Sequence, residues 1–460
     1  MSSVHPGSLG KLGGMSDGAG AGEDHDDPVS RLRELVRVPT VSHPDHRDEA
    51  AFDRFLDLLA RLFPLLHSAL ELTRVGGHGL LFRWAGTGGG DPVVLMAHTD
   101  VVPVAGRWTH PPFDAHTEDG WVWGRGTLDD KGPLGAICEA VEALLADGFT
   151  PARDVWLSFG CDEEVFGSGA EAAVAELSAR GVRPWFVLDE GGAVAAEALP
   201  GLSRPLAVIG VTEKGTTSLR LTATGKGGHA STPARNGPTA RIARAISRLE
   251  RTPLPPRLPE VTLRLFGDLA PLVAPPLRPV LAAASRLPRL VTRALIAAGP
   301  ETTALARTTI AVTTLSGSPA INVVAATATA GLNIRVMPGD TVAEVVAHVR
   351  RVVGPGIEVE VLQANEASPV SPHRGDPAFD LLGRAITAVF PDATPMPYVM
   401  MAATDSRHFT TLCDRVYRFA PLRMSKAQRE SIHAADERVE TSAYLDGIRW
   451  FRLLLTTLPA

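Results

Sequence analysis

The chain has 460 residues, of which 45% are hydrophobic and 21% charged, and its formal net charge is -6. This composition can bury a large core and excludes an intrinsically disordered protein, and the length favours two or three domains over one. The mild acidity, without clusters of lysine or arginine, argues against nucleic acid as a partner.

The N-terminal segment is rich in glycine, serine and aspartate and lacks the apolar stretch of a signal peptide, so we expect residues 1–27 to form a disordered tail. We predict no integral membrane segment. A membrane helix needs roughly 18–20 apolar residues, and arginines and prolines interrupt the best candidate, 269–299. The 3 cysteines are widely spaced and form no CxxC pair. That pattern is typical of a reducing compartment, and we expect a cytoplasmic protein.

In the first half of the chain, helical patterns alternate with continuous apolar runs, which are typical of strands buried on both faces. In chain order they predict a helix at 48–63, a strand at 92–97, a helix after Pro133, a strand at 155–159, a helix at about 168–180 and a strand at 185–188. This alternation predicts an α/β fold in which helices sandwich a mostly parallel sheet.

The pattern changes near residue 211 and returns near residue 365. The middle block predicts strands at 216–224 and 326–336 and helices at 238–251 and 341–353, and the last block predicts helices near 376–389 and 440–457. Proline is dense from 253 to 300, as in an insertion. We therefore expect an α+β domain at 211–364 inserted between two parts of one domain, 28–210 and 365–460.

Acidic and imidazole side chains directly follow the three strands of the first half. They are His98 and Asp100 after the first strand, Glu163 and Glu164 after the second, and Asp189 after the third. In open parallel sheets, ligands bind beyond the carboxyl ends of the strands. Asp129 and Asp130 precede the helix at Pro133 and could join this group.

Each group alone has an ordinary structural interpretation. A His-x-Asp pattern is often a surface or capping pair, Asp129–Asp130 could cap the following helix, and Glu163–Glu164 could lie in a solvated loop. Together, however, several carboxylates at one sheet edge would repel one another strongly. Divalent cations resolve that repulsion, and mixed histidine and carboxylate ligation suits zinc, cobalt or manganese.

These motifs resemble those of the M20 family of metallopeptidases, which includes Gly-Xaa carboxypeptidases, aminoacylases and succinyl-diaminopimelate desuccinylases. The resemblance runs from about Leu35 to the C-terminus. It is carried by Leu-Met-Ala-His98-Thr-Asp100, Gly-Arg-Gly-Thr-Leu-Asp129-Asp130-Lys-Gly, Glu163-Glu164, Asp189, Gly227-Gly228-His229-Ala-Ser and Ser431-Ile-His433-Ala-Ala-Asp-Glu437. Thr109-His-Pro-Pro-Phe113, Asp405-Ser-Arg407-His408 and the long insertion are most similar to the carboxypeptidase-S-like branch.

The resemblance implies a zinc-exopeptidase-like fold with an inserted lid and a site for two Zn²⁺ ions, for which Co²⁺ or Mn²⁺ could substitute. The implied ligands are Asp129 bridging both ions, His98 and Asp189 on one ion, and Glu164 and His433 on the other. Asp100 would hydrogen-bond His98, and Glu163 would be the general base for a hydroxide that bridges the metals. In the family the Asp129–Asp130 peptide bond is cis. Relatives often have Asn-Glu where this chain has Asp436-Glu437, a difference that leaves the ligand His433 intact.

The resemblance also implies substrate contacts from the inserted lid. His229 would stabilise the oxyanion, in some members across a dimer. Without the resemblance, Gly225–His229 is typical of an ordinary hairpin with an exposed histidine. Asn322 and Arg335 would hold the substrate's carboxylate, although an arginine that ends a strand is usually a solvated charge. Arg407 and His408 are less specific candidates.

We therefore expect a zinc-dependent hydrolase that cleaves the amide bond of a small peptide or N-acyl amino acid with a free carboxylate. One alternative is an N-long-chain-acyl amino acid hydrolase, which the apolar stretch 269–299 favours, or a biosynthetic deacylase of the same fold. Another is a non-catalytic binding homologue. The sequence does not decide between a monomer and a homodimer formed through the lid, because the insertion 253–300 occupies the region by which many dimeric relatives associate.

Overall fold

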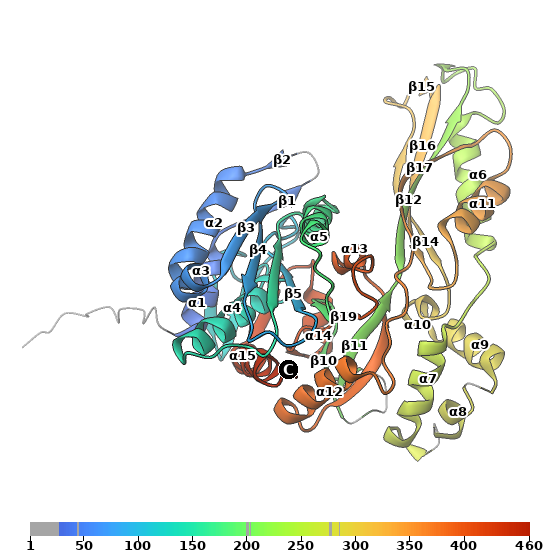
Figure 1. Cartoon of the computed structure of the whole chain (residues 1–460). Coiled ribbons are helices and arrows are strands. Elements are labelled where there is room, and N and C mark those ends of the chain that lie inside the picture. The colour runs from blue at the N-terminus through green and yellow to red at the C-terminus, as the bar shows by residue number, and fades with distance from the viewer. Residues whose placement is uncertain (1–26, 44–45, 199–201, 203, 276–277, 285) are drawn as a thin grey trace, which may run out of the picture.

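The computed structural model describes residues 27–43, 46–198, 202, 204–275, 278–284 and 286–460. It shows a broad domain built on a central sheet and a long lid that rises from one side of it (Figure 1). The tail predicted at 1–27 lies outside the described residues except for Asp27, whose carboxylate caps helix α1 (Pro28–Arg37).

The central sheet has ten strands. In chain order they are β3 (Glu71–Val75), β4 (Gly79–Trp84), β5 (Val93–His98), β8 (Val155–Gly160), β9 (Phe186–Asp189), β10 (Ala193–Ala195), β11 (Leu206–Glu213), β18 (Thr394–Met400), β19 (Val416–Arg418) and β20 (Arg423–Met424). Across the sheet the order is β20-β10-β11-β19-β9-β5-β8-β4-β3, and β18 also pairs with β11. The central strands β8, β5, β9 and β19 are parallel, so their carboxyl ends share one edge.

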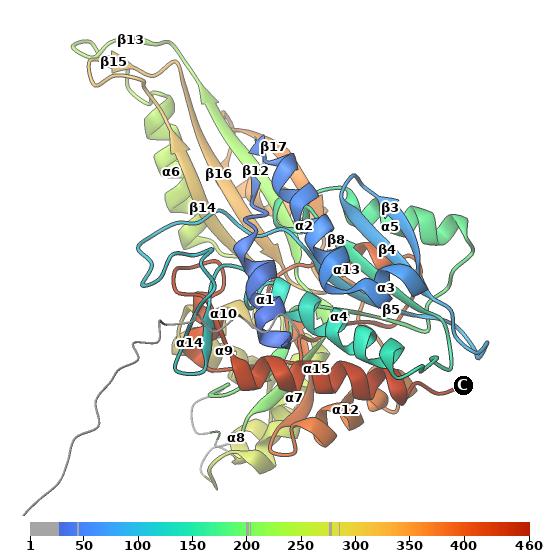
Figure 2. The same ribbon diagram turned by 90° about the vertical axis from the view of Figure 1, so that its left-hand side faces the viewer.

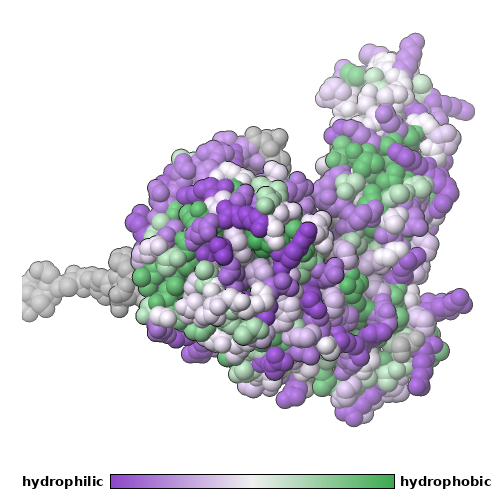
Figure 3. Space-filling view, viewed as in Figure 1, coloured by the Kyte–Doolittle hydropathy of each residue, from purple (hydrophilic) through white to green (hydrophobic). Residues whose placement is uncertain are grey.

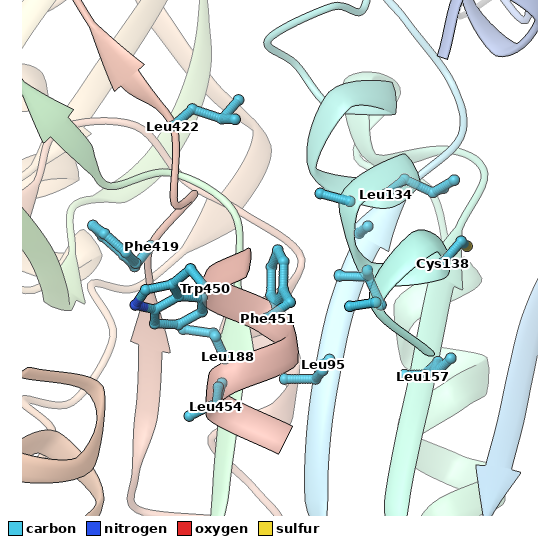
Figure 4. Packing of buried hydrophobic residues seen from close by; sticks show 14 of the residues in the cluster. Leu95, Leu134, Cys138, Leu157, Leu188, Phe419, Leu422, Trp450, Phe451 and Leu454 are labelled. Atoms are coloured by element: carbon cyan, nitrogen blue, oxygen red, sulfur yellow. The ribbon is translucent and has the colours of Figure 1, made fainter. Parts of the chain in front are cut away.

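Helices cover both faces of this sheet. One core contains residues of α1 and of five further helices: α2 (Glu49–Leu62), α3 (Pro64–Ala69), α4 (Lys131–Ala146), α12 (Pro377–Val389) and α15 (Thr441–Thr456). A second core contains residues of α5 (Gly169–Ala179) and α13 (Ser406–Phe409). Within β5, Leu95 packs into the core that includes Trp450 of α15 (Figure 4). Its neighbours Val94 and Met96 pack with α5 on the opposite face. Burial on both faces explains why these strands are continuous apolar runs.

The lid is a separate antiparallel sheet of four strands in the order β14-β16-β12-β17. Their bounds are β12 (Gly215–Thr224), β14 (Thr309–Ser316), β16 (Thr327–Val336) and β17 (Glu358–Asn365), and the lid helices are α6 (Pro238–Arg251) and α11 (Val342–Val353). The two helices pack on one face, where alternate residues such as Leu332 and Ile334 are buried. The short pair β13 (Gly228–His229) and β15 (Val323–Val324) forms the tip, far from the central sheet (Figure 2).

The proline-dense insertion forms a small helical unit. Its helices are α7 (Glu260–Leu269), the 3₁₀ turn η2 (Ala270–Leu272), α8 (Arg278–Ala282), α9 (Pro288–Ala298) and α10 (Pro300–Ala304). Phe266 and Leu269 of α7 pack with Leu206 of β11 and Met396 of β18. The insertion therefore covers the edge of the central sheet rather than the lid sheet.

The remaining elements are short. They are the pair β1 (Ser42–His43) and β2 (His46–Arg47), the three-stranded sheet of β6 (His116–Glu118), β7 (Trp121–Trp123) and β21 (Arg438–Glu440), the 3₁₀ turn η1 (Glu163–Val165) and helix α14 (Lys426–Ser431). Among the described helices, none is both long and apolar enough to cross a membrane.

The predicted fold class is confirmed: helices sandwich a mostly parallel sheet, and a separate antiparallel domain interrupts the chain. Each helix and strand predicted from the sequence is present with bounds that differ by a few residues at most. The second sheet runs from Gly215 to Asn365, close to the predicted lid at 211–364.

Candidate metal centre

The predicted metal ligands of the first half meet at the carboxyl edge of the central sheet. His98 is the last residue of β5 and Asp189 the last residue of β9. Glu163 and Glu164 lie in η1, beyond the end of β8 at Gly160. In a regular strand two adjacent side chains would point to opposite faces, so this turn is what allows both carboxylates to serve one site.

The Asp129 carboxylate lies between two imidazoles. Its Oδ1 is 3.0 Å from Nε2 of His98, and its Oδ2 is 3.0 Å from Nε2 of His433. The same His433 nitrogen is 3.1 Å from Oε2 of Glu164. Residues from four separate parts of the chain thus converge, and each oxygen of Asp129 faces a different histidine.

This donor set fits divalent cations. Donor atoms of His98, Asp129 and Glu164 all lie within 4.8 Å of one another, close enough together to hold metal ions. The second oxygen of Glu164, Oε1, is buried and has no hydrogen-bond partner among the described residues. A buried carboxylate oxygen without a partner is costly, and a cation would satisfy it.

Asp100 supports both sides of the centre. Its carboxylate accepts hydrogen bonds from the backbone N–H groups of Glu163 and Glu164, at 3.3 and 3.2 Å. Nδ1 of His98 lies 3.0 Å from the backbone oxygen of Asp100 and 3.4 Å from its Oδ1. Asp100 therefore orients the predicted base and two predicted ligands, and the carbonyl is the nearer partner of His98.

Asp130 does not cap the following helix through its side chain. Its Oδ2 accepts a hydrogen bond from the backbone N–H of His98 at 3.0 Å, and the Asp129–Asp130 peptide bond is cis, as the resemblance implied. Asp189 is buried, and its Oδ2 accepts a hydrogen bond from the backbone N–H of Ser406 at 2.9 Å.

A buried ion pair holds the loop that carries Asp129. Arg125 donates to Oε2 of Glu437 at 2.6 Å, and Oε1 of Glu437 accepts from the backbone N–H groups of Leu128 and Asp129 at 2.8 and 3.3 Å. Glu437 thereby ties this loop to the segment that carries His433. Arg125 was not among the site residues predicted from the sequence, although it lies inside the Gly-Arg-Gly-Thr-Leu-Asp129 motif.

The electrostatics of the centre follow from burial and from the two imidazoles. Burial raises the pKa of Glu163 well above its ordinary range. Hydrogen bonds to Asp129 and Glu164 raise the pKa of His433 to about 10. Burial opposes ionisation of Asp129, but hydrogen bonds from His433 and His98 outweigh it and lower the pKa of that carboxyl. The protein itself thus offers a carboxylate held in its charged form between two imidazoles.

A second acid, Asp405, also borders the centre. It lines a small buried space of about 10 Å³ together with His98, Glu163 and Asp189. Burial raises its pKa to about 7, against the nearby charge of Arg407. In the sequence, Asp405 stood out only as part of the Asp405-Ser-Arg407-His408 motif of the resemblance. Arg407, a candidate for substrate contact, donates to the backbone oxygen of Thr404 and lies 3.6 Å from Asp405, while His408 lies 3.5 Å from Glu171.

The predicted lid residues divide into two groups. His229 and Asn322 lie together at the lid tip, where the backbone N–H of Ala230 donates to the backbone oxygen of Asn322 at 3.1 Å. Within one chain this tip is remote from the metal centre (Figure 2). Arg335 lies at the other end of the lid, donates to Thr216, and is close enough for Glu163 to raise its pKa against the lowering effect of burial.

Comparisons with known proteins agree with this geometry. Residues 94–457 match the model of peptidase family M20/M25/M40. The chain is 36% identical to a probable carboxypeptidase S-like 2 of Dictyostelium discoideum, over 90% of this chain and 82% of that protein. It is 35% identical, with the same coverage, to the N-fatty-acyl-amino acid synthase/hydrolase PM20D1 of Xenopus tropicalis. Its fold is similar to the crystal structure of an M20 family metallo-carboxypeptidase, Sso-CP2 of Sulfolobus solfataricus, with a TM-score of 0.67 and 18% identity over 93% of this chain and 98% of that one.

Proposed function

Since the chain belongs to the M20 family of metallopeptidases and is a hydrolase of that family, we propose that it cleaves the amide bond of a small peptide or N-acyl amino acid with a free carboxylate. The observation that carries this proposal is the Asp129 carboxylate, which lies 3.0 Å from both His98 and His433 beside the buried Glu163. Water and the amide would give a carboxylic acid and a free amine.

Two divalent cations would be held by His98, Asp129, Glu164, Asp189 and His433, with Asp129 shared because its two oxygens face different histidines. Zinc suits this mixture of imidazole and carboxylate, and cobalt or manganese could replace it. When bound, such ions act as Lewis acids that favour a nucleophile at neutral pH and stabilise negative charge on a carbonyl oxygen.

Glu163 would move the proton. Its carboxylate would take a proton from the attacking water and pass it to the nitrogen of the leaving amine, while the amide C–N bond breaks. Burial raises the pKa of Glu163, which suits a group that must both accept and donate a proton near neutral pH. Asp100 would keep Glu163 in place through its backbone N–H.

Arg335 would recognise the free carboxylate of the substrate. It lies on the polar face of the lid sheet at the end nearest the metal centre, within reach of the charge of Glu163. A guanidinium group suits a carboxylate because it offers two parallel N–H donors. The exposed His229 and Asn322 could act only if the tip reached a metal centre, for example that of a second copy.

A lid-mediated homodimer is therefore part of the proposal. The two edge strands of the lid carry exposed apolar side chains, among them Val312 and Leu315 on β14 and Val361 on β17. Hydrophobic surface is visible on the lid in Figure 3. Light scattering coupled to size exclusion gives the mass directly, and a monomer at all concentrations would contradict a dimer.

A second candidate is hydrolysis of N-long-chain-acyl amino acids. It is supported by the 35% identity to the protein named N-fatty-acyl-amino acid synthase/hydrolase. It would also account for the apolar side chains of the insertion helices, since a long acyl chain is itself apolar. The chemistry at the metal centre would be the same, and only the acyl group would differ.

The test combines metal removal with a substrate panel. Chelation should abolish hydrolysis, and Zn²⁺ or Co²⁺ should restore it. The panel compares dipeptides, N-acetyl amino acids and N-palmitoyl amino acids, each with a free carboxylate and as the matching amide. Hydrolysis that survives complete removal of metal, or activity on none of these classes after metal loading, would refute the proposal.

A further inference from the structure

A largely apolar cavity of about 440 Å³ lies between the insertion helices and the edge of the central sheet. Its walls include Val208 on β11, Leu265 and Phe266 on α7, Ala304 and Leu305 of the α10 segment, and Met401 just after β18. None of the described residues that line it is charged. The volume falls within the roughly 300–1,000 Å³ that ligand sites usually occupy.

A short series of contacts links the cavity wall to the segment that follows Asp189. Met400 packs so closely against Gly191 that a side chain at that position would overlap it, and Gly191 follows the predicted ligand Asp189 by two residues. The next residue, Met401, lines the cavity. The loop after β9 and the end of β18 therefore connect the metal centre to the cavity wall.

A second connection runs through Lys214, where the chain passes from the central sheet to the lid. Its Nζ donates to the backbone oxygens of Ala304, a cavity residue, and Arg307, at 2.6 and 2.9 Å. Lys214 is also close enough to Arg335 for the charge of Arg335 to help burial lower the pKa of Lys214. The cavity wall is thus tied to the same end of the lid that faces Glu163.

We propose that this cavity binds the hydrocarbon chain of a long-chain N-acyl amino acid, with the amide at the metal centre. The inference rests on the proposed amide hydrolysis and adds the site that selects the acyl group. An aliphatic chain suits walls of leucine, valine, phenylalanine and methionine because each buried methylene strengthens binding by about fourfold. A peptide would leave its backbone N–H and C=O groups without partners there.

The first experiment fills the cavity from two walls. Leu265→Trp on α7 and Ala304→Leu on α10 are compared with Leu290→Trp, which places the same bulk on the exposed side of α9, outside the cavity. The readout is the ratio of kcat/KM for the N-palmitoyl derivative to that for the N-acetyl derivative of one amino acid. We expect wild type and Leu290→Trp to share a ratio above about 10, and the cavity variants to lower it at least tenfold. Circular dichroism would detect a variant that fails to fold, and the variant on the other helix would then still test the cavity.

The second experiment measures binding without turnover. Parinaric acid, a fluorescent long-chain fatty acid, is titrated into the metal-loaded protein and the same variants. Saturable binding to wild type that weakens at least tenfold in the cavity variants supports the site. If the protein binds parinaric acid in this way but hydrolyses no amide substrate, only the proposed function fails. The inference would be overturned if Leu265→Trp and Ala304→Leu changed neither the kcat/KM ratio nor the affinity for parinaric acid. The proposal of amide hydrolysis would still stand.

Discussion

The central sheet and the lid sheet differ in how many of their faces are covered by helices, although side chains alternate between two faces in both. Helices cover both faces of the central sheet, so its inner strands β5 and β9 are apolar until their last residues, the polar His98 and Asp189. Helices α6 and α11 cover one face of the lid sheet, so its strands alternate and a polar face runs along their whole length. A site on the first sheet is therefore confined to one edge, whereas on the second it can lie anywhere along a face.

The largest effect should come from the edge of the central sheet. We expect Glu163→Gln to lower kcat by about 10²–10⁴-fold, the usual contribution of general acid–base catalysis, while metal content measured by mass spectrometry stays at the wild-type value. Glu360→Gln on lid strand β17 is the control and should keep full activity. Wild-type activity in Glu163→Gln would remove Glu163 as the base.

Buried and exposed ion pairs offer a second contrast. Arg418 and Glu213 are both buried in the central sheet, with Nε of Arg418 3.1 Å from the carboxylate, and the same carboxylate accepts from the backbone N–H of Thr404. Arg418→Met leaves that charge uncompensated and should cost about 3–5 kcal/mol in the free energy of unfolding.

The matched change lies in the lid sheet, where Arg220 pairs with Glu360 across β12 and β17 at the same 3.1 Å but with both side chains about half exposed. Arg220→Met should cost at most about 1 kcal/mol. Urea unfolding followed by circular dichroism measures both. If Arg418→Met and Arg220→Met lowered the free energy of unfolding equally, burial would not explain how much each ion pair contributes to stability.

The polar face of the lid gives a third test. Arg335→Ala should reduce kcat/KM for a substrate with a free carboxylate by about 10–100-fold, because hydrogen bonds to a charged group contribute about 1.5–3 kcal/mol. The corresponding amide should be much less affected. Arg220→Ala, on the same face but farther along the strands, is the control. An equal loss on acid and amide would refute carboxylate recognition by Arg335.

A further expected effect is a pH dependence of stability at the junction of the two sheets. Burial lowers the pKa of Lys214 to about 8, below the value of about 10.4 for an unfolded chain. Between these values the unfolded state binds more protons, so stability should rise with pH from about 8 towards 10, and the full penalty applies below pH 8.

Urea midpoints at pH 7.5 and 9.5 measure this rise, which should be smaller in Lys214→Met than in wild type. Lys226→Met, at an exposed lysine of the lid, should rise as wild type does. A rise of the same size in Lys214→Met would assign the pH dependence to other groups.

The contrast between the sheets also explains what could be predicted. Strand ends in the first half indicated His98, Glu163, Glu164 and Asp189. The loop before the helix at Pro133 offered Asp129, and the family resemblance added His433. Arg125 was missed because its partner Glu437 is more than three hundred residues away, and no local pattern reports such a pair. The short strands β18, β19 and β20 lack a clear period, and β18 contains two prolines, so the C-terminal contribution to the sheet was visible only in the structure.

That C-terminal contribution has a consequence for how the molecule holds together. Strand β19 pairs with β9 on one side and β11 on the other, while β18 pairs with β11 and β20 with β10. The two parts of the chain on either side of the lid are thus interleaved within one sheet. A protease that nicks the lid would leave two fragments that remain one particle, and neither fragment alone can bring His433 to Asp129.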